Sequence, residues 1–246
     1  MENKHRHKRL KFALIAAAAV IIVMIVAMAV YFGTYYHSVD VEEYFTDSEA
    51  VTVTVMDSGW LFDGEGEDTA LIFYPGAKVE ASAYAPLLYE LAKTGIDCFL
   101  VKMPLRMAIF GANKALYITE TYDYETWILA GHSLGGAMAA SCAASNPDTF
   151  DVLLLLAAYT TKEIDENVSV LSLYGSEDGV LNMDSLEAGR ELVPEDYTEI
   201  CIEGGNHAQF GSYGEQAGDG TATISPEEQR QAVIDALTEL LQRRRI

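Results

Sequence analysis

The segment Gly-His-Ser-Leu-Gly at residues 131–135 constrains the fold of this chain more than any other feature. The apolar run Trp127–Ala130 precedes it, and the small-residue run Leu134–Ala144 follows it. A strand that passes directly into a helix at a serine holds that serine in strained backbone geometry, and glycines on either side leave room for the turn. Strand–helix units of this kind are typical of α/β proteins.

Short apolar runs alternate with helical patterns through most of the chain. Strands are predicted at Val51–Met56, Trp60–Phe62, Ala70–Tyr74, Asp97–Val101, Trp127–Ala130, Val152–Ala157, Val168–Tyr174 and Tyr197–Ile202. Helices are predicted at Ser82–Lys93, Leu134–Ala144 and from Ser225 to about Leu241. The first two strands flank a turn-like Asp-Ser-Gly, which predicts an antiparallel hairpin. The pattern predicts an α/β fold with a mostly parallel sheet flanked by helices.

Composition excludes some classes of function. The formal net charge is −21, and five of the 16 Lys and Arg residues lie within the first 11 positions. An acidic body of this kind repels phosphates, so nucleic-acid binding is not expected. Cys98, Cys142 and Cys201 are too widely spaced for a disulfide framework or a metal site. We therefore expect neither a metal ion nor a cofactor.

Ser133 is the candidate nucleophile, and a serine hydroxyl needs a base and a group that orients the base. Asp178 follows the next-to-last predicted strand, and His207 follows the last one. His207 is also the only histidine after Ser133. The order Ser, Asp, His predicts Ser133 as nucleophile, Asp178 as acid and His207 as base. Glu177 adjoins Asp178 and is the alternative acid.

Acyl transfer at Ser133 also needs donors for a developing oxyanion. The N–H of Leu134, directly after the serine, is one candidate. The loop after Ala70–Tyr74 supplies the other, and we choose the N–H of Ala77, with Gly76 or Lys78 as alternatives. We interpret His132 as part of the turn, with a role as a second base as the alternative.

Five sequence motifs carry a resemblance to a known family. They are Tyr-Pro-Gly-Ala at 74–77, Met-Pro-Leu at 103–105, Gly-His-Ser-Leu-Gly-Gly-Ala-Met-Ala at 131–139, Tyr-Gly-Ser-Glu-Asp-Gly at 174–179 and the Gly-rich stretch with Asn-His at 204–214. Over about residues 50–245 the chain resembles bacterial α/β-hydrolases related to dienelactone hydrolases (carboxymethylenebutenolidases). The resemblance implies the α/β-hydrolase fold, the same triad and an esterase or lactonase activity. Dienelactone hydrolases proper have a cysteine nucleophile, whereas this chain has Ser133.

Other residues are candidates for substrate binding. Lys78, Lys102 and Arg106 follow neighbouring strands at the edge where such sheets bind ligands, which favours an anionic substrate; ordinary surface ion pairs are the alternative. Phe210 and Tyr213 lie in the glycine-rich loop 209–220, which either walls the pocket or packs against the closing helix. Only ten residues, 158–167, separate two strands where related proteins carry a lid. We expect a lidless, open site without interfacial activation.

The N-terminal region predicts attachment to a membrane. Residues 12–32 carry no charge, and a helix of that length spans roughly 30 Å at about 1.5 Å per residue, the thickness of a bilayer core. The preceding basic residues favour a cytoplasmic N-terminus, with the rest outside. A cleaved signal is the alternative, because Ala-Met-Ala at 27–29 resembles a cleavage site, and the domain would then be secreted.

The sequence thus predicts four parts: a basic cytoplasmic tail at 1–11, an anchor or signal at 12–32, a linker at 33–50 and a catalytic domain at 51–246. The predicted function is hydrolysis of a small ester, thioester or lactone through an acyl-serine intermediate on Ser133. The partners expected are this small molecule and the membrane. Acyl transfer by the same residues, or a binding module that retains the fold without turnover, are the alternatives.

Overall fold

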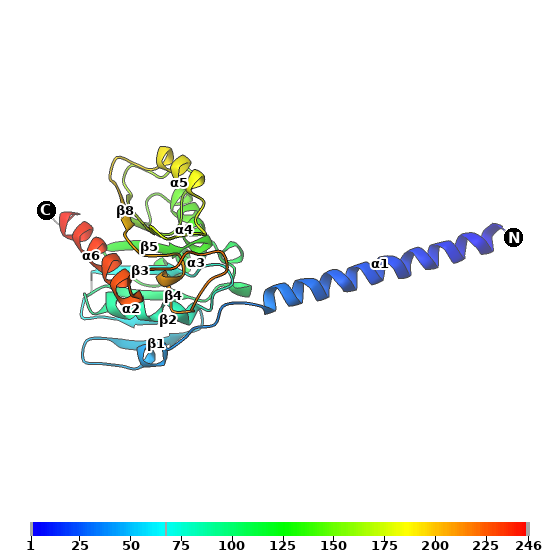
Figure 1. The fold of residues 1–246 in the computed structure, drawn as a ribbon, viewed down its shortest axis with the longest axis horizontal. Coiled ribbons are helices and arrows are strands. Elements are labelled where there is room, and N and C mark those ends of the chain that lie inside the picture. Colours follow the sequence, from blue (N-terminus) through cyan, green and yellow to red (C-terminus); the bar gives the residue numbers. More distant parts are fainter. Residues whose placement is uncertain (1, 67, 245–246) are drawn as a thin grey trace. The chain divides into compact units, whose positions relative to one another are not determined.

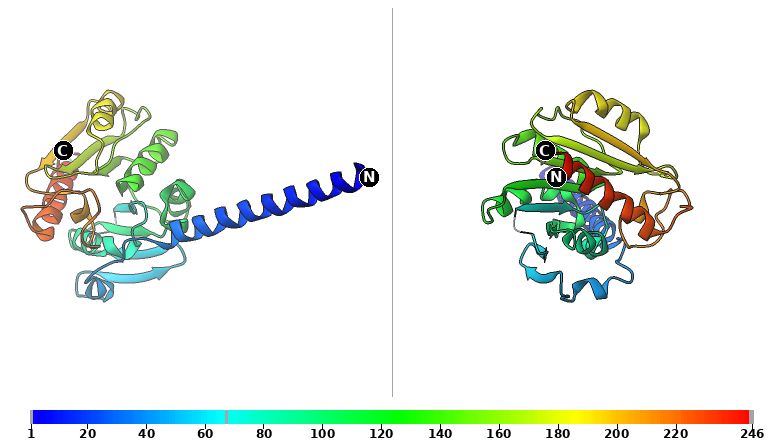
Figure 2. Two further views of the ribbon diagram at one scale, coloured as in Figure 1. Left: turned by 45° about the vertical axis from the view of Figure 1, so that its right-hand side comes forward. Right: turned by 90° about the vertical axis from the view of Figure 1, so that its left-hand side faces the viewer.

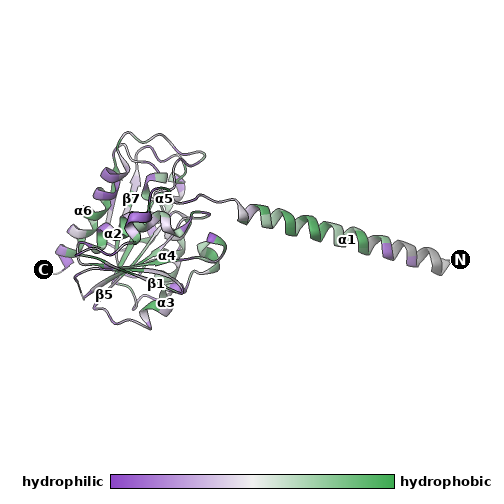
Figure 3. Ribbon diagram, turned by 90° about the horizontal axis from the view of Figure 1, so that it is seen from below, coloured by the Kyte–Doolittle hydropathy of each residue, from purple (hydrophilic) through white to green (hydrophobic). Residues whose placement is uncertain are grey.

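The computed structural model describes residues 2–66 and 68–244, which form two compact units that meet between Tyr35 and Tyr36. The first unit is a single helix, α1 (Glu2–Gly33) (Figure 1). Its segment Leu14–Gly33 is long and apolar enough to cross a membrane by length and composition, and its apolar character is evident in Figure 3. A signal sequence would have the same properties, so both interpretations of this segment stand.

The second unit is built on one eight-stranded sheet in the order β1-β2-β4-β3-β5-β6-β7-β8 (Figure 1). Strands β1 and β2 form an antiparallel hairpin, β2 is also antiparallel to β4, and all later pairs are parallel. The strands are β1 (Thr52–Met56), β2 (Gly59–Asp63), β3 (Thr69–Tyr74), β4 (Asp97–Val101), β5 (Thr126–His132), β6 (Val152–Leu156), β7 (Ser169–Gly175) and β8 (Tyr197–Ile202). The predicted hairpin and parallel sheet are confirmed.

Helices cover both faces of the sheet. They are α2 (Ala85–Ala92), α3 (Lys114–Thr119), α4 (Leu134–Ser145), α5 (Met183–Gly189) and α6 (Pro226–Arg244). Buried residues of α2 and α6 share one core cluster, and those of α3 and α4 share the other. Figure 2 shows α4 and α6 on opposite sides of the sheet. Covering both faces explains why the strands are continuous apolar runs rather than alternating ones.

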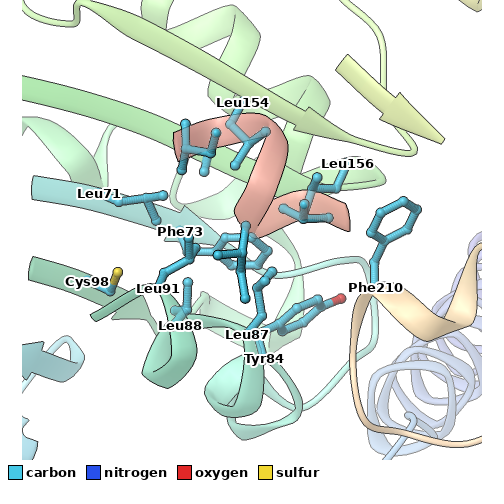
Figure 4. Close-up of a cluster of buried hydrophobic side chains, with 14 of the residues drawn as sticks. Leu71, Phe73, Tyr84, Leu87, Leu88, Leu91, Cys98, Leu154, Leu156 and Phe210 are labelled. Carbon is cyan, nitrogen blue, oxygen red and sulfur yellow. The ribbon is translucent and has the colours of Figure 1, made fainter. Parts of the chain in front are cut away.

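Alternate side chains of each central strand enter the two cores. In β3, Leu71 and Phe73 point to the core shared by α2 and α6, which Figure 4 shows together with Leu154 of β6. Ala70 and Ile72 belong to the opposite core. This period of two is the strand geometry expected of a sheet buried on both sides.

Helix α3 was not predicted from the sequence, because a tertiary contact holds its start. Helix α3 is only six residues long. The hydroxyl of Tyr74, at the end of β3, accepts a hydrogen bond from the N–H of Ala115 at 2.7 Å and donates one to the carbonyl of Ala112 at 2.8 Å. A helix this short has little stability of its own, and a distant tyrosine supplies its cap.

Residues 36–50 are part of the second unit, although the sequence predicted them to be a linker. Tyr36 forms a parallel bridge with Val79, and Val41 is only 4% exposed. The ring of Phe45 lies 5.1 Å from that of Trp60 in β2. The aromatic and branched side chains in this polar stretch bury themselves on the sheet, so the globular part begins at Tyr36 and not at residue 51.

A cavity made in the packed core should destabilise the protein. Leu154 is fully buried in β6, so Leu154→Ala should lower the free energy of unfolding by about 2–5 kcal/mol. Val55→Ala is the matched control, because Val55 is 73% exposed, and it should change that energy by less than about 0.5 kcal/mol. Denaturant titration followed by tryptophan fluorescence measures both, and equal effects would contradict this packing.

Candidate active site

Ser133 lies on the sharp turn between β5 and α4 that the sequence predicted. Its backbone has φ 52° and ψ −125°, a strained combination for a residue with a side chain. The N–H of Ser133 donates to the carbonyl of Leu156 at 2.9 Å, which fixes the turn to β6. A Cβ on Gly135 would approach the carbonyl oxygen of Tyr74 to 2.1 Å, so only glycine allows this close approach. The serine is thereby held beside the loop that follows β3.

The acid and the base that the sequence predicted are in direct contact. His207 Nδ1 lies 2.9 Å from Asp178 Oδ2, and both side chains are almost fully buried. The other carboxylate oxygen of Asp178 accepts the N–H groups of Val180 and Leu181 at 2.9 and 2.8 Å. Glu177 is exposed and accepts from the hydroxyl of Ser176 instead. The structure therefore pairs His207 with Asp178 rather than with Glu177.

The pairing determines what the other ring nitrogen can do. With Nδ1 bonded to a carboxylate, His207 carries its proton there and presents a basic Nε2. This Nε2 is buried and has no hydrogen-bond partner among the described residues. A buried nitrogen without a partner is costly in a native structure, and catalytic groups are a common reason for one.

Hydrogen bonding distinguishes the three oxyanion candidates in the loop after β3. Gly76 donates its N–H to the hydroxyl of Tyr84 at 3.0 Å, and Lys78 donates its N–H to the carbonyl of Arg106 at 2.8 Å. The N–H of Ala77 has no such bond within the part of the chain that the structure describes. Leu134 begins α4, where the first N–H groups have no partner within the helix. Of the three candidates in this loop, Gly76 and Lys78 thus use their N–H groups within the fold, and Ala77 and Leu134 stay the predicted oxyanion donors.

His132 is a structural part of the turn. Its ring is fully buried, and its Nδ1 lies 2.8 Å from the hydroxyl of Tyr84. The same hydroxyl accepts the N–H of Gly76, so it bridges His132 and the loop after β3. Burial lowers the pKa of His132 well below its usual value, and the nearby ring of His207, at 4.4 Å between centroids, lowers it further. His132 is therefore neutral; it is bonded through Nδ1, has no partner at Nε2 among the described residues, and connects the turn at Ser133 to the loop after β3.

Asp219 is a positioning residue that the sequence analysis did not identify. Its Oδ1 accepts the N–H groups of Gly179 at 3.1 Å and His207 at 3.2 Å, and its Oδ2 accepts that of Ala208 at 2.8 Å. One carboxylate thus ties the loop of Asp178 to the loop of His207. The only sequence signal is a Gly-Asp-Gly in the middle of a glycine-rich loop.

The three predicted basic residues have different surroundings. Lys102 Nζ lies 3.9 Å from the ring centre of Trp60, which places its charge over the β1–β2 hairpin. Lys78 and Arg106 are linked through their backbones at the oxyanion loop, and both have positive φ angles of 58° and 56°. The structure therefore keeps Lys78 and Arg106 at the edge of the site, and holds Lys102 on an aromatic ring.

Phe210 and Tyr213 are core residues rather than parts of an open pocket. Phe210 is 1% exposed, with its ring 5.6 Å from that of His132. Tyr213 is 4% exposed, and its ring lies 5.5 Å from that of Tyr36. Both side chains are too large and apolar to remain in solvent, so the loop packs them inward. Loop 209–220 thus buries these two rings beside His132 and Tyr36, while other residues of the loop line a cavity.

The chain between Leu156 and Ser169, where the sequence left no room for a lid, contains no helix. A cavity of about 640 Å³ lies elsewhere, between residues 39–44 and residues 206–222, and Ser133, Asp178 and His207 are not among the residues that line it. Among the described residues, no group of three or more His, Cys, Asp or Glu could hold a metal ion.

Comparison with known proteins agrees with the strand order and the turn at Ser133. Residues 70–231 match the model of the Alpha/beta hydrolase family. The chain belongs to the α/β-hydrolase family. A curated relative, a putative non-heme haloperoxidase from Mycobacterium phage D29, is 28% identical over 115 residues, which cover 43% of this chain and 41% of the relative. The chain therefore spans less than half the length of that relative.

Solved structures of hydrolases share the same fold. An α/β hydrolase named MGS-MChE2, from the metagenome of sediments of the Mar Chica lagoon in Morocco, has a TM-score of 0.58 and 18% identity, over 79% of this chain and all of its own. Est1E from Butyrivibrio proteoclasticus has a TM-score of 0.56 and 12% identity, over 79% and 100%. A predicted CIB-like hydrolase from Thermoplasma acidophilum has a TM-score of 0.57 and 16% identity, over 76% and 98%. At these identities the likeness shows the fold alone.

The buried His132 predicts a pH dependence of stability. Because the pKa of His132 is lowered in the folded protein, its contribution to stability is complete above about pH 6.5 and falls as the pH drops toward the folded pKa. From pH 6.5 to 5 the free energy of unfolding should fall by up to about 2 kcal/mol more in wild type than in His132→Gln. Denaturant titrations at both pH values measure this difference, and parallel losses in the two proteins would contradict it.

Proposed function

We propose that this α/β-hydrolase is a membrane-anchored serine hydrolase that cleaves small esters through an acyl-serine intermediate. The observation that carries the proposal is the buried pair of His207 and Asp178, which are 2.9 Å apart and leave His207 Nε2 without a partner among the described residues. The ring of His207 lies 4.4 Å from that of His132, the residue before Ser133 on its strained turn. Nucleophilic serine chemistry requires a serine hydroxyl, a base beside it and an acid that orients the base.

The residues act in a defined sequence in this proposal. His207 Nε2 takes the hydroxyl proton as Ser133 Oγ attacks the ester carbonyl, and the N–H groups of Leu134 and Ala77 bind the oxyanion. His207 then returns the proton to the leaving alcohol. Water attacks the acyl-serine with His207 again as base, and the acid is released. Thioesters and lactones fit the same steps, and an acceptor alcohol in place of water would give acyl transfer.

The anchor is the second part of the proposal. Leu14–Gly33 has the length and composition of a membrane span, and the basic residues before it favour a cytoplasmic N-terminus. The catalytic unit then lies outside the cytoplasm. Cleavage after residue 29 would release the same unit as a secreted enzyme. The motifs that resemble those of dienelactone hydrolases favour a small ester or lactone as substrate.

A fluorophosphonate probe tests the nucleophile. The full chain should become covalently labelled, and Ser133→Ala should abolish labelling, because the probe reacts only with an activated serine. Ser145→Ala is the matched control on the same helix and should label like wild type. Gel fluorescence measures the result. A folded wild-type protein that takes no label would favour the alternative of a non-catalytic binding module.

Variants of Asp178 and of its neighbour Glu177 test which carboxylate is the acid of the triad. Asp178→Asn should lower kcat for p-nitrophenyl acetate by up to about 10⁴-fold, because the amide no longer holds His207 in the tautomer that presents a basic Nε2. Glu177→Gln, one residue away, should stay within about twofold of wild type. Steady-state rates with p-nitrophenyl esters of graded chain length would also define the acyl group. Equal losses in the two variants would exclude Asp178 as the specific acid.

A further inference from the structure

Exposed apolar side chains gather in the loop that follows β4. Leu105 is 53% exposed, Ile109 is 55% exposed and Phe110 is 52% exposed, and we call these three residues the apolar rim. Ala108, between them, is fully buried in the core shared with α4. The rim is therefore fixed to the body of the protein and presents apolar surface to solvent. Clusters of this kind on a folded domain mark interaction surfaces.

The apolar rim borders the candidate catalytic site. The carbonyl of Arg106 accepts the N–H of Lys78 in the oxyanion loop at 2.8 Å. The turn Ala108–Phe110 packs against α4, whose first residue follows Ser133. Leu105 and Arg106 both have positive φ angles, so the surrounding structure maintains a strained backbone here.

A very short stretch of chain joins α1 to the second unit. Only Thr34 and Tyr35 separate Gly33, the end of α1, from Tyr36, the first residue of the second unit. Three residues span at most about 11 Å. Tyr36 donates its N–H to the carbonyl of Lys78 at 2.7 Å and accepts the N–H of Glu80 at 2.9 Å. The candidate membrane segment therefore ends three residues before Tyr36, which bonds to the loop after β3.

From these observations we propose that the apolar rim contacts the lipid bilayer and that the substrates are esters carried at the membrane surface. The inference rests on the proposed anchor and hydrolase activity. A tether of about 11 Å or less allows the edge that bears the rim to reach the bilayer interface, where half-exposed apolar side chains are favourable. Arg106 lies within the rim segment and Lys114 follows it in an otherwise acidic body, and these positive charges favour anionic head groups. Because no lid has to open, the hydrolysis of a soluble ester does not require a membrane interface.

Lipid quenching tests the contact without any assay of activity. Cys201 is the exposed cysteine of three and is replaced by serine, and a fluorophore is attached to Ile109→Cys in the full chain. The protein is placed in vesicles of phosphatidylcholine and phosphatidylglycerol that contain spin-labelled lipid. Thr121→Cys is the control, because Thr121 is exposed and precedes β5, at the opposite edge of the sheet.

Quenching by the spin-labelled lipid should be at least about threefold stronger at position 109 than at position 121. Equal quenching at both positions, or none at either, would overturn the proposal. So would a probe at 109 that is shielded from aqueous iodide but not quenched by the lipid, because a second protein chain would then cover the rim.

A rate comparison tests the substrate class. In the same vesicles, we compare the rate on a long-chain p-nitrophenyl ester in the bilayer with the rate on soluble p-nitrophenyl acetate. The ratio of the first rate to the second should fall about tenfold in Ile109→Glu/Phe110→Glu. It should also fall when a flexible insert of about 30 Gly and Ser residues, with a mean span of about 30 Å, follows Gly33. Val55→Glu is the charge control, since Val55 is exposed on β1, and it should keep the wild-type ratio.

Failure of this proposal is distinct from failure of the proposed hydrolase. Unchanged ratios in the rim variant and the insertion variant would overturn the membrane substrate while leaving hydrolysis intact. A wild-type chain that hydrolyses neither ester would refute the hydrolase and with it the substrate class.

Discussion

The close approach of the backbone of Gly135 to the carbonyl of Tyr74 is the constraint on which the site depends. The parallel pairing of β3 with β5 places Tyr74 opposite Gly131, so the oxyanion loop and the nucleophile turn leave the sheet side by side. A Cβ at position 135 would lie 2.1 Å from the Tyr74 oxygen. The loop after β3 and the turn at Ser133 are therefore held against each other through their backbones.

Hydrogen bonds between loops extend this rigidity to the base. Asp178 holds His207, and Asp219 bonds to backbone N–H groups of both of their loops. On the other side, Tyr84 connects Gly76 to His132. In the proposed mechanism, such supporting contacts hold the candidate catalytic groups within the small tolerance that acyl transfer requires. The strained backbone of Ser133 is itself held by the bond from its N–H to the carbonyl of Leu156.

The sequence predicted what depends on local pattern and strand order. Gly131 and Gly135 flanking Ser133, and the positions of Asp178 and His207 after the last two strands, follow from chain order in this type of sheet. Burial and long-range bonds could not be predicted. Nothing local distinguishes Asp219 from a turn residue, or shows that Phe210 packs into the core.

The same limit applies to the segment after α1, where a polar composition concealed an edge that pairs with the oxyanion loop at Tyr36. In the proposed mechanism, Ser133 carries the acyl group while its neighbours position the base and the oxyanion. Rapid mixing of the full chain with p-nitrophenyl acetate, followed by acid quench and peptide mass spectrometry, tests it most directly. We expect a rapid burst in which about one nitrophenolate is released per chain, and an acetyl group on Ser133. Acetylation of another residue, or turnover without an acetylated serine, would contradict it.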